Sequence, residues 1–427
     1  MTRKALSHLR ALPHNRNIII NTVGTYLGFV FSAIYIVFFV RVLTPAEFGL
    51  LSVLQAFSYL LTNILSFGMP ASVYAHLPSH RHSQAELSQY VLSNVLVMTA
   101  LSSLSLAILY AFVRDIDVRF LRTLASDQLF VLALVGTQMY IWQNFLTDVL
   151  NASGHFLHIN VSNNLSHVVR VCVLVGLALT GHLTIGSILF VMGIVGPCVV
   201  FIRTALSWPA FMRHLAHAQI TRETVRLSYT FTYYLASQLY QLATRTDLFL
   251  ISYFLTRPEV GFYGLSQKIL LAVVTSSDSI TQVLSPQFAQ ARTYVEVRTL
   301  LKHMATYMLL PASLFAGGIL LPKEIYTLVF SAQYDTSTAV TKALSLAYII
   351  TPFISGILLV FLYTIKKPYY LLMTNALLCT IILSMNYHFI PSLRLFAAPI
   401  AYGVAHVVVG VFLLGALRYE MGLLPKE

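Results

Sequence analysis

The sequence predicts an all-α fold, a polytopic membrane protein with twelve transmembrane helices in two six-helix lobes. Three observations predict it: the composition, the length of the apolar runs and a motif that occurs once in each half. Of the 427 residues, 57% are hydrophobic and 10% are charged, whereas soluble domains have roughly 45–50% apolar and about 25% charged residues. With a mean hydropathy of +0.75, the composition argues against a water-soluble enzyme, because one or two cores could not bury so much apolar surface.

The apolar runs predict the individual helices. A spanning helix needs about 20 largely apolar residues, and an open non-helical segment cannot satisfy its backbone hydrogen bonds in hydrocarbon. The first run follows a segment with four basic residues and is too long for a cleaved signal peptide, so we expect it to be retained. The predicted spans cover residues 17–40, 50–77, 87–113, 128–150, 157–180, 183–207, 228–255, 261–285, 302–321, 338–365, 369–390 and 396–417.

Charge in the predicted loops indicates the orientation. Twelve spans place both termini on one side, and the segments on that side hold more than twice as many Lys and Arg residues as the opposite segments. The positive-inside rule therefore predicts cytoplasmic termini. The net charge of +12 suggests anionic lipid headgroups or an anionic cargo in such a chain, and no nucleic-acid partner is predicted.

A short motif indicates an internal repeat. The sequence LTPAEFG at residues 43–49 is matched by LTRPEVG at residues 255–261, with Leu, Thr, Glu and Gly at equal offsets. Each copy lies in the outer turn that joins the first two helices of a six-helix half. Because six is even, the halves should share one orientation and be related by a pseudo-two-fold axis along the membrane normal. We therefore predict an N-terminal lobe over 1–207, a cytoplasmic linker over 208–227 and a C-terminal lobe over 228–427.

The same residues resemble a known family. The sequence RVLTPAEFGLL at 41–51 resembles the R-x-L-x-P-x-E-[FY]-G-L opening of the oligosaccharide (O-antigen type) flippases. The sequence DLFLI at 247–251, followed by EVGFY at 259–263, is similar to the family's D-x-x-x-I and E-V-G-x-Y signature on helices seven and eight. These flippases belong to the multidrug/oligosaccharidyl-lipid/polysaccharide exporter (MOP) superfamily. One departure, Ser266 where relatives usually carry Ala, exchanges one small residue for another.

The resemblance implies a V-shaped transporter that moves a polyprenyl-diphosphate-linked oligosaccharide from the inner to the outer leaflet by alternating access. Such a protein needs a wet path, so polar side chains should share single helix faces. Stripes of this kind occur on several predicted helices, including Tyr140, Asn144 and Asp148 on the fourth. The residues that we expect to bind the glycan are Asn21, Gln55, Tyr59, Tyr234, Gln238 and Gln241. Hydrogen bonding between helices is the alternative for these uncharged groups.

Basic residues inside the spans indicate where a diphosphate would bind. Arg203 and Lys342 lie near helix ends and can reach the interface. Arg170 and Arg245 lie roughly 15–20 Å from the helix ends, where an ionised side chain costs at least about 2.5–3.5 kcal/mol. Arg can grip a diphosphate through two parallel hydrogen bonds, and we expect Lys268 to add attraction. The alternative for each arginine is a structural ion pair within its own lobe.

Three acidic residues also lie within predicted spans, and we assign them to gating or coupling: Asp148, Asp247 and Asp278. Asp247 and Lys268 are both about 10–12 Å from the outer turn, which predicts an ion pair between them. Arg245 and Asp247 are two residues apart and should not face the same space on a continuous helix. Asp278 is a candidate carrier of a coupling proton or sodium ion, and a satisfied buried carboxyl is the alternative.

Two rival functions are weaker. A polytopic glycosyltransferase or polymerase would find support in Asp115-Ile116-Asp117, a D-x-D pattern that could hold a metal, but the loop is short and no second acidic cluster accompanies it. An ion-coupled multidrug exporter of the same superfamily predicts mainly acidic and aromatic cavity groups, whereas five basic and three acidic residues lie within the spans. We therefore do not expect an enzyme.

No cofactor and no metal is predicted. The sequence contains no G-x-x-x-x-G-K-[ST], H-E-x-x-H or G-x-S-x-G motif. The three cysteines are scattered singly in apolar runs, and His80 and His82 have no companion ligands nearby. The prediction is thus a multi-pass flippase of the cell inner membrane, whose partners are the lipid-linked oligosaccharide, membrane lipids, a candidate coupling proton or sodium ion and, as a further candidate, glycan assembly enzymes. The pattern leaves open which glycan is carried.

Overall fold

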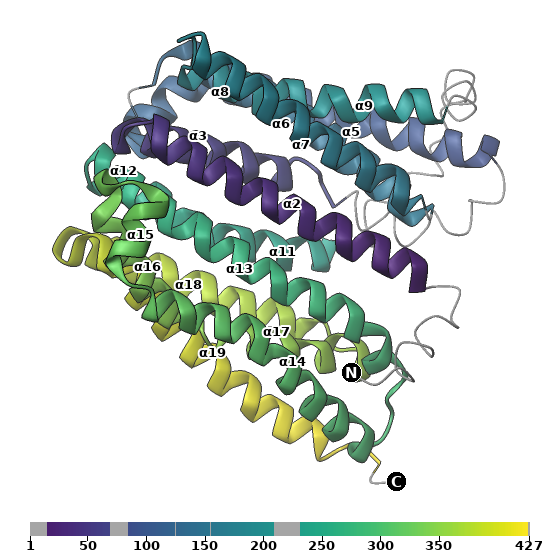
Figure 1. Ribbon diagram of the computed structural model, residues 1–427. Helices are drawn as coiled ribbons and strands as arrows, with labels where there is room; N and C mark the ends of the chain where they lie inside the picture. The colour runs from purple at the N-terminus through teal and green to yellow at the C-terminus, as the bar shows by residue number, and fades with distance from the viewer. Residues whose placement is uncertain (1–14, 69–83, 124, 154, 209–230, 426–427) are drawn as a thin grey trace. The chain divides into compact units, whose positions relative to one another are not determined.

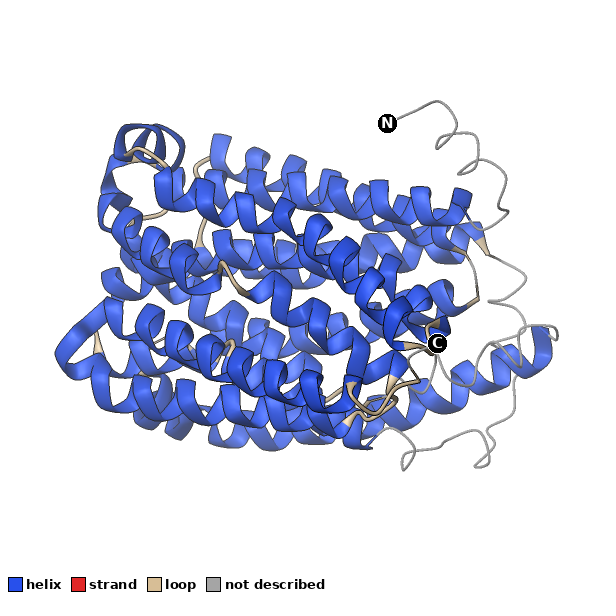
Figure 2. Ribbon diagram, turned by 90° about the horizontal axis from the view of Figure 1, so that it is seen from below, coloured by secondary structure: helices blue, strands red, loops and turns tan. Residues whose placement is uncertain are grey.

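The computed structural model describes residues 15–68, 84–123, 125–153, 155–208 and 231–425 (Figure 1). In this part of the chain every regular element is a helix, as Figure 2 shows. Helices occur in every predicted range as far as that range is described, and seven helical stretches of the described chain are long and apolar enough to cross a membrane. The predicted all-α, polytopic membrane fold is therefore confirmed.

The first part of the chain forms long helices joined by short turns. The predicted second span begins earlier than expected, at Pro45, and its helix ends at Ile64, while residues 69–77 lie outside the described part. The elements are α2 (Asn15–Val42), α3 (Pro45–Ile64), α5 (Gln84–Ile116), η1 (Asp117–Leu121), α6 (Asp127–Ala152), α7 (Phe156–Leu179), α8 (Ile185–Phe190), η2 (Val191–Val195) and α9 (Gly196–Ser207).

The second part of the chain is also helical but has more interruptions. The predicted seventh span is broken at Thr244–Arg245, and the tenth at Ile349–Ile350. The elements are α11 (Phe231–Ala243), α12 (Thr246–Phe254), α13 (Arg257–Gln290), α14 (Tyr294–Leu320), α15 (Lys323–Phe330), η4 (Ala332–Tyr334), α16 (Asp335–Tyr348), α17 (Thr351–Leu359), η5 (Val360–Thr364), α18 (Tyr369–Leu393), η6 (Arg394–Phe396) and α19 (Ala397–Met421).

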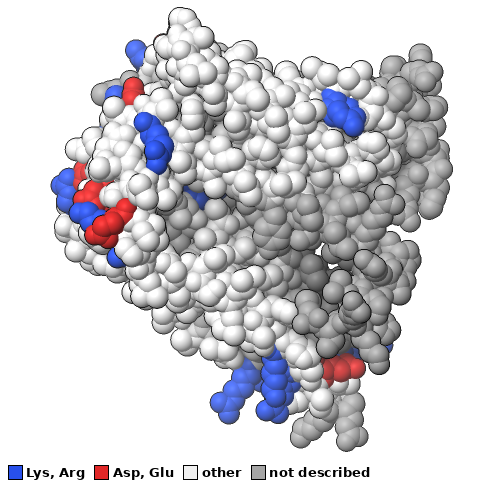
Figure 3. All heavy atoms as spheres, viewed as in Figure 1, with Lys and Arg blue, Asp and Glu red and all other residues white. Residues whose placement is uncertain are grey.

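The helices group into two compact units. The first contains residues up to Tyr35, 57–115 and 125–234, and the second contains 36–56, 116–124 and the chain from Leu235 onward. The segments 36–56 and 116–124, which the sequence analysis assigns to the N-terminal lobe, thus cluster with the second unit. On the face seen in Figure 3, charged side chains gather in a few clusters and uncharged atoms cover the areas between them, as a lipid-facing surface requires.

Small residues allow close helix packing in the first unit. A Cβ built on Gly136 of α6 would lie 3.2 Å from the Cα of Gly193 in η2, and a Cβ on Gly24 of α2 would overlap the side chain of Asn160 in α7. Without a hydrophobic driving force between helices in lipid, such close backbone contact supplies much of the association energy. These glycines therefore allow α6 to pack closely against η2 and α2 to pack closely against α7 within this unit.

The repeated motif has a local structural role in the second unit. The carboxylate of Glu47 accepts hydrogen bonds from the backbone N–H (2.9 Å) and hydroxyl (2.8 Å) of Thr44, and Glu259 accepts the same pair from Thr256 (3.1 and 2.7 Å). Both are capping boxes, in which the Thr and Glu satisfy the free N–H groups at a helix start. The Thr and Glu that match between the halves therefore define where α3 and α13 begin.

The glycines of the two motif copies lie against each other. A Cβ on Gly49 would lie 2.8 Å from the backbone nitrogen of Gly261, and a Cβ on Gly261 would overlap the carbonyl of Pro45. Nearby, the Arg41 guanidinium donates to the backbone carbonyl of Leu328 (2.5 Å) and the Tyr334 hydroxyl donates to that of Leu43 (3.1 Å). The starts of α3 and α13 thus cross at their backbones.

The Asp115-Ile116-Asp117 pattern lies where α5 ends and η1 begins. The Asp117 carboxylate accepts hydrogen bonds from the backbone N–H (2.8 Å) and hydroxyl (2.6 Å) of Thr123, while Asp115 is exposed. Within the described residues there is no group of three or more His, Cys, Asp or Glu side chains placed to hold a metal. Asp117 therefore closes the chain reversal between α5 and α6.

Candidate functional site

Arg170 lies near the middle of α7 and is buried, with 5% of its surface exposed. Its guanidinium lies beside the Tyr35 hydroxyl and 5.9 Å from the centre of the Tyr140 ring. A Cβ on Gly196 would overlap the guanidinium, so the bare backbone of α9 makes room for it. No described residue accepts a hydrogen bond from its Nε or Nη2. The side chain thus presents unsatisfied N–H donors inside an apolar helix.

Aromatic side chains position the groups around Arg170. The Tyr35 hydroxyl donates to the backbone carbonyl of His167 (2.9 Å) and lies 3.3 Å from Nδ1 of the same residue. The His167 ring stacks on Phe31, with the centroids 5.3 Å apart and an interplanar angle of 11°. These contacts join α2 to α7 one turn before Arg170. They fix Tyr35 at the edge of the guanidinium.

Arg245 lies at a break between two helices. Its backbone (φ −128°, ψ −26°) is not helical, so α11 ends at Ala243 and α12 begins at Thr246. The prediction that Arg245 and Asp247 face different spaces assumed a continuous helix, and the break removes that assumption. The two side chains lie close enough to interact electrostatically. Arg245 is half-buried.

Asp247 is fully buried and surrounded by hydrogen-bond donors. Its carboxylate accepts hydrogen bonds from the backbone N–H of Leu248 (2.7 Å), from Gln267 Nε2 (2.9 Å to each oxygen), from the Tyr402 hydroxyl (3.0 Å) and from the Tyr263 hydroxyl. These donors come from α12, α13 and α19. The carboxylate therefore joins three helices directly beside the break.

The predicted ion pair between Asp247 and Lys268 is wrong by one residue. Gln267, the neighbour of Lys268, faces the carboxylate, whereas Lys268 Nζ donates to the side-chain oxygen of Gln55 and lies 5.5 Å from the centre of the Phe48 ring. The two residues do lie on adjacent helices, α12 and α13, but successive helical residues are about 100° apart, so only one of Gln267 and Lys268 can face the carboxylate. Two predicted site residues, Gln55 and Lys268, are thus brought together in the second unit.

The remaining predicted residues are distributed over both units. Tyr59 is 44% exposed, and the Tyr234 hydroxyl donates to the carbonyl of Ile64 at the end of α3 (2.6 Å). Gln238 and Gln241 are half-buried on α11. The side chains of Asn21 and Asp278 lie outside the described residues.

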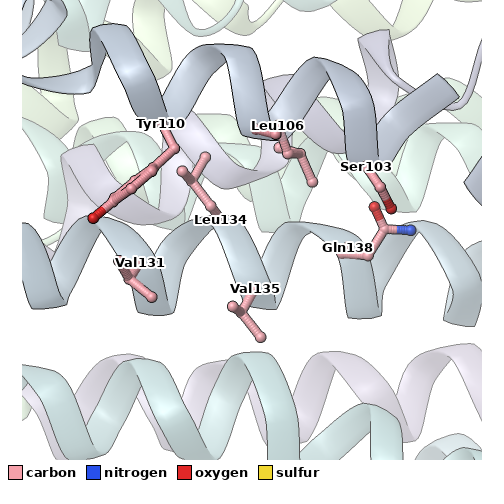
Figure 4. A pocket seen from close by; sticks show the side chains of 8 residues that line it. Ser103, Leu106, Tyr110, Val131, Leu134, Val135 and Gln138 are labelled. Atoms are coloured by element: carbon pink, nitrogen blue, oxygen red, sulfur yellow. The ribbon is translucent and has the colours of Figure 1, made fainter. Parts of the chain in front are cut away.

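Two pockets in the first unit differ in character. The larger, about 500 Å³, lies between α5 and α6, and Figure 4 shows its mainly apolar lining. Its lining residues Tyr110 and Val135 are 49% and 43% exposed, so it is a groove at the surface of the unit. The smaller, about 280 Å³, lies between α3, α5 and α6 and is lined by polar groups that include Asp148. The sequence placed Asp148 and Asn144 on one face but gave no sign of the α3 residues opposite them.

The fold and these buried charges define a polytopic helical membrane protein with polar groups inside its helix bundles. The chain belongs to the polysaccharide biosynthesis protein family, whose model matches residues 15–292. This confirms the family resemblance that the motifs at 41–51 and 247–263 predicted.

Solved structures show a similar fold. The lipid II flippase MurJ in an inward closed conformation is 13% identical, with 94% of this chain and 87% of that chain covered and a TM-score of 0.76. A multidrug resistance MATE family transporter of the MOP superfamily, in an inward-facing conformation, is 12% identical, with 95% and 99% covered and a TM-score of 0.70. At such identities the likeness concerns the fold alone. No curated protein sequence matches the chain.

Proposed function

We propose that this protein moves a polyprenyl-diphosphate-linked oligosaccharide from the inner to the outer leaflet of the cell inner membrane by alternating access. Membership of the polysaccharide biosynthesis protein family supports a glycan cargo. The fold is shared with transporters, one of which is described as a lipid II flippase. The transfer of a lipid-linked glycan across the bilayer is a function that fits both the family and the fold.

The observation that carries the proposal is the state of Arg170. A buried guanidinium without an acidic partner is costly, since the desolvation of the charge is repaid only when its N–H groups are satisfied. Among the described residues Arg170 forms no ion pair, and two of its nitrogens lack an acceptor. A diphosphate supplies both the opposite charge and a pair of oxygens that match the guanidinium fork.

The other site residues have roles that follow from their placement. Arg245, held at the break between α11 and α12, and Lys268, beside Gln55, add positive charge in the second unit. Tyr59, Tyr234, Gln238, Gln241 and Asn21 are candidates for hydrogen bonds to the glycan, together with Gln55. The donor-rich surroundings of Asp247 favour support of the helix break over gating or coupling. Asp278 is the candidate group for coupling to a proton or sodium ion.

The transport cycle would move two lobes, residues 1–207 and 228–427, about the linker at 208–227. The excess of Lys and Arg in alternate loops supports cytoplasmic termini. In this orientation the capping boxes at Thr44 and Thr256 lie on the outer side, and the ends of α3 and α6 lie toward the cytoplasm.

A deletion strain complemented with variants tests the proposal. The deletion should accumulate lipid-linked precursor on the cytoplasmic leaflet and lose surface glycan. Arg245→Ala should abolish surface glycan at an unchanged protein level, and Arg203→Ala is the matched control because Arg203 lies near the end of α9. Normal glycan display by Arg245→Ala would remove Arg245 from the mechanism. Normal display in the deletion strain would contradict the function itself.

An ion-coupled multidrug exporter is the second candidate, favoured by the fold shared with MATE transporters. It predicts that the deletion strain becomes sensitive to cationic drugs while its surface glycan is unchanged. The buried, positively charged Arg170 argues against this candidate, because it repels a cationic cargo. The two outcomes of the same deletion therefore separate the two functions.

A further inference from the structure

The short helix α15 of the second unit has an exposed apolar flank. Leu328 and Ile325 are 73% and 48% exposed, and Leu320, the last residue of the preceding helix α14, is 78% exposed. Residues three apart are neighbours on a helix surface, so Ile325 and Leu328 form one continuous face. An exposed apolar surface of this kind marks a contact with lipid or with another protein.

The other sides of α15 are buried or charged. Tyr326 is buried, and its hydroxyl lies 3.2 Å from the hydroxyl of Thr341 in α16. Lys323 pairs with Asp335 (2.7 Å), and both side chains are exposed, as is Glu324. Because successive residues are about 100° apart, α15 has one buried, one charged and one apolar side. A charged side next to an exposed apolar side is typical of a helix that lies at a membrane surface.

The chain places α15 at a membrane boundary. The preceding helix α14 is one of the stretches long and apolar enough to cross a membrane, and only Leu321 and Pro322 separate it from α15. Both residues have extended backbones, with ψ of 120° and 144°, so α15 does not continue α14. With eight residues it is about 12 Å long, too short to cross a hydrocarbon core of about 30 Å. It therefore begins where α14 leaves the hydrocarbon, at one end of the second unit (Figure 1).

Hydrogen bonds hold α15 in one orientation against the turn between α2 and α3. The Arg41 guanidinium donates to the carbonyls of Leu328 (2.5 Å) and Val329 (3.3 Å), which are among the carbonyls that a helix end leaves free. Gln333, just after α15, donates to the carbonyl of Leu43 (3.1 Å). The apolar flank is therefore held at a fixed place relative to the first motif copy.

We propose that α15 is an interfacial helix, whose Ile325 and Leu328 insert into the lipid at the membrane boundary. Lipid is the partner that the neighbouring surface favours, because the exposed leucines of α14, among them Leu310 and Leu314, lead to Leu320 and the apolar flank. The charged side then faces the headgroups and water. In the orientation proposed above, α15 lies in the outer leaflet and anchors the turn between α2 and α3 there through Arg41. The inference does not depend on which cargo is carried.

The accessibility of nitroxide labels in vesicles tests the proposal. The full chain, with its three cysteines replaced by alanine, receives one new cysteine through Leu328→Cys, Ile325→Cys or Glu324→Cys. Each variant is spin-labelled and reconstituted in phosphatidylcholine vesicles. We expect the labels at 328 and 325 to collide with oxygen, which concentrates in lipid, and to be shielded from a water-soluble nickel chelate. The label at 324 is the matched control on the charged side, and its ratio of oxygen to nickel collisions should be several-fold lower.

Three results would overturn the proposal. Frequent nickel collisions at 325 or 328 would place the apolar flank in water. Shielding of these labels from both reagents would show that protein covers the flank instead of lipid. Equal collision ratios at all three positions would show that the helix does not lie with one side in lipid and another in water. If Leu328→Cys does not fold, as judged by its melting temperature, Ile325→Cys decides. These outcomes report only the place of α15, so they stay separate from any failure of the flippase function.

Discussion

Arg170 and Asp247 are both buried charges within helices, but their surroundings differ. Asp247 accepts hydrogen bonds from four groups on three helices, whereas the Nε and Nη2 of Arg170 find no acceptor in the described chain. One charge is satisfied by the fold and the other is not. Since an unsatisfied buried charge reduces stability, we expect Asp247 to stabilise the structure and Arg170 to lower its stability, and the proposed function assigns a ligand to Arg170.

The largest expected effect is loss of folding in Asp247→Ala. The change removes the acceptor for Tyr263, Tyr402 and Gln267 together, and each buried donor left without an acceptor costs about 1–3 kcal/mol. Thermal unfolding and the elution profile of the purified variant measure this loss. A variant that folds with wild-type stability but does not export glycan would instead show that Asp247 has a functional role. Asp247 and Arg170 would then no longer differ in role.

Arg170→Met should have the opposite signature. Replacing an unsatisfied buried charge with an apolar side chain of similar length leaves stability unchanged or raised, but removes the grip on a diphosphate. Export of surface glycan should fall by about tenfold or more, since each charge-assisted hydrogen bond is worth about 1.5–3 kcal/mol. Arg170→Lys should restore part of the export, because Lys keeps the charge without the fork. A large drop in melting temperature with Arg170→Met would show that Arg170 is structural.

A third prediction changes the space around Arg170 and leaves Arg170 itself intact. Gly196→Ala adds a Cβ where the guanidinium lies, so the side chain must move and export should fall less than with Arg170→Met. The matched control is Gly176→Ala on α7, where a Cβ meets no atom within 4 Å. The two variants are compared by surface glycan at equal protein level. Equal export by both would show that the position of the guanidinium does not matter.

The smallest expected effect concerns the ion pair between the exposed Arg394 and Glu259. Its loss gives the stability change to compare with those at the buried Asp247 and Arg170. Burial alone would raise the pKa of Glu259, but hydrogen bonds from Thr256 and the ion pair with Arg394 (2.7 Å) hold it below its ordinary value. Because the Arg394 side chain is 61% exposed, Arg394→Gln should cost at most about 1 kcal/mol.

The pH dependence of that small effect follows from the lowered pKa. A carboxyl group with a lowered pKa stabilises the fold above its unfolded pKa, and this contribution is lost as the pH falls through the folded value. The difference in melting temperature between wild type and Arg394→Gln should therefore be present near neutral pH and disappear in acid. A difference that grows in acid would contradict this assignment.

Much of the fold follows from the sequence, because long apolar runs can only be helices in lipid. The break at Arg245 could not be predicted, since neither Gly nor Pro occurs between Phe231 and Arg257. The break coincides with the tertiary hydrogen bonds to Asp247. The sequence predicted that α13 would place a side chain against Asp247 but not that this side chain would be Gln267, because which side chain faces a neighbour depends on how helices rotate as they pack. The α3 residues that line the polar pocket could not be predicted for the same reason.

The crossing of Gly49 and Gly261 restricts which substitutions the two motif copies can accept. A side chain at either glycine would overlap the main chain of the other motif copy. Neither position can therefore accept a larger residue. A methyl group at one position would push apart both helix starts, and no shortening at the other position could compensate, since glycine is already the smallest residue. Each motif copy therefore limits which residue the other can carry.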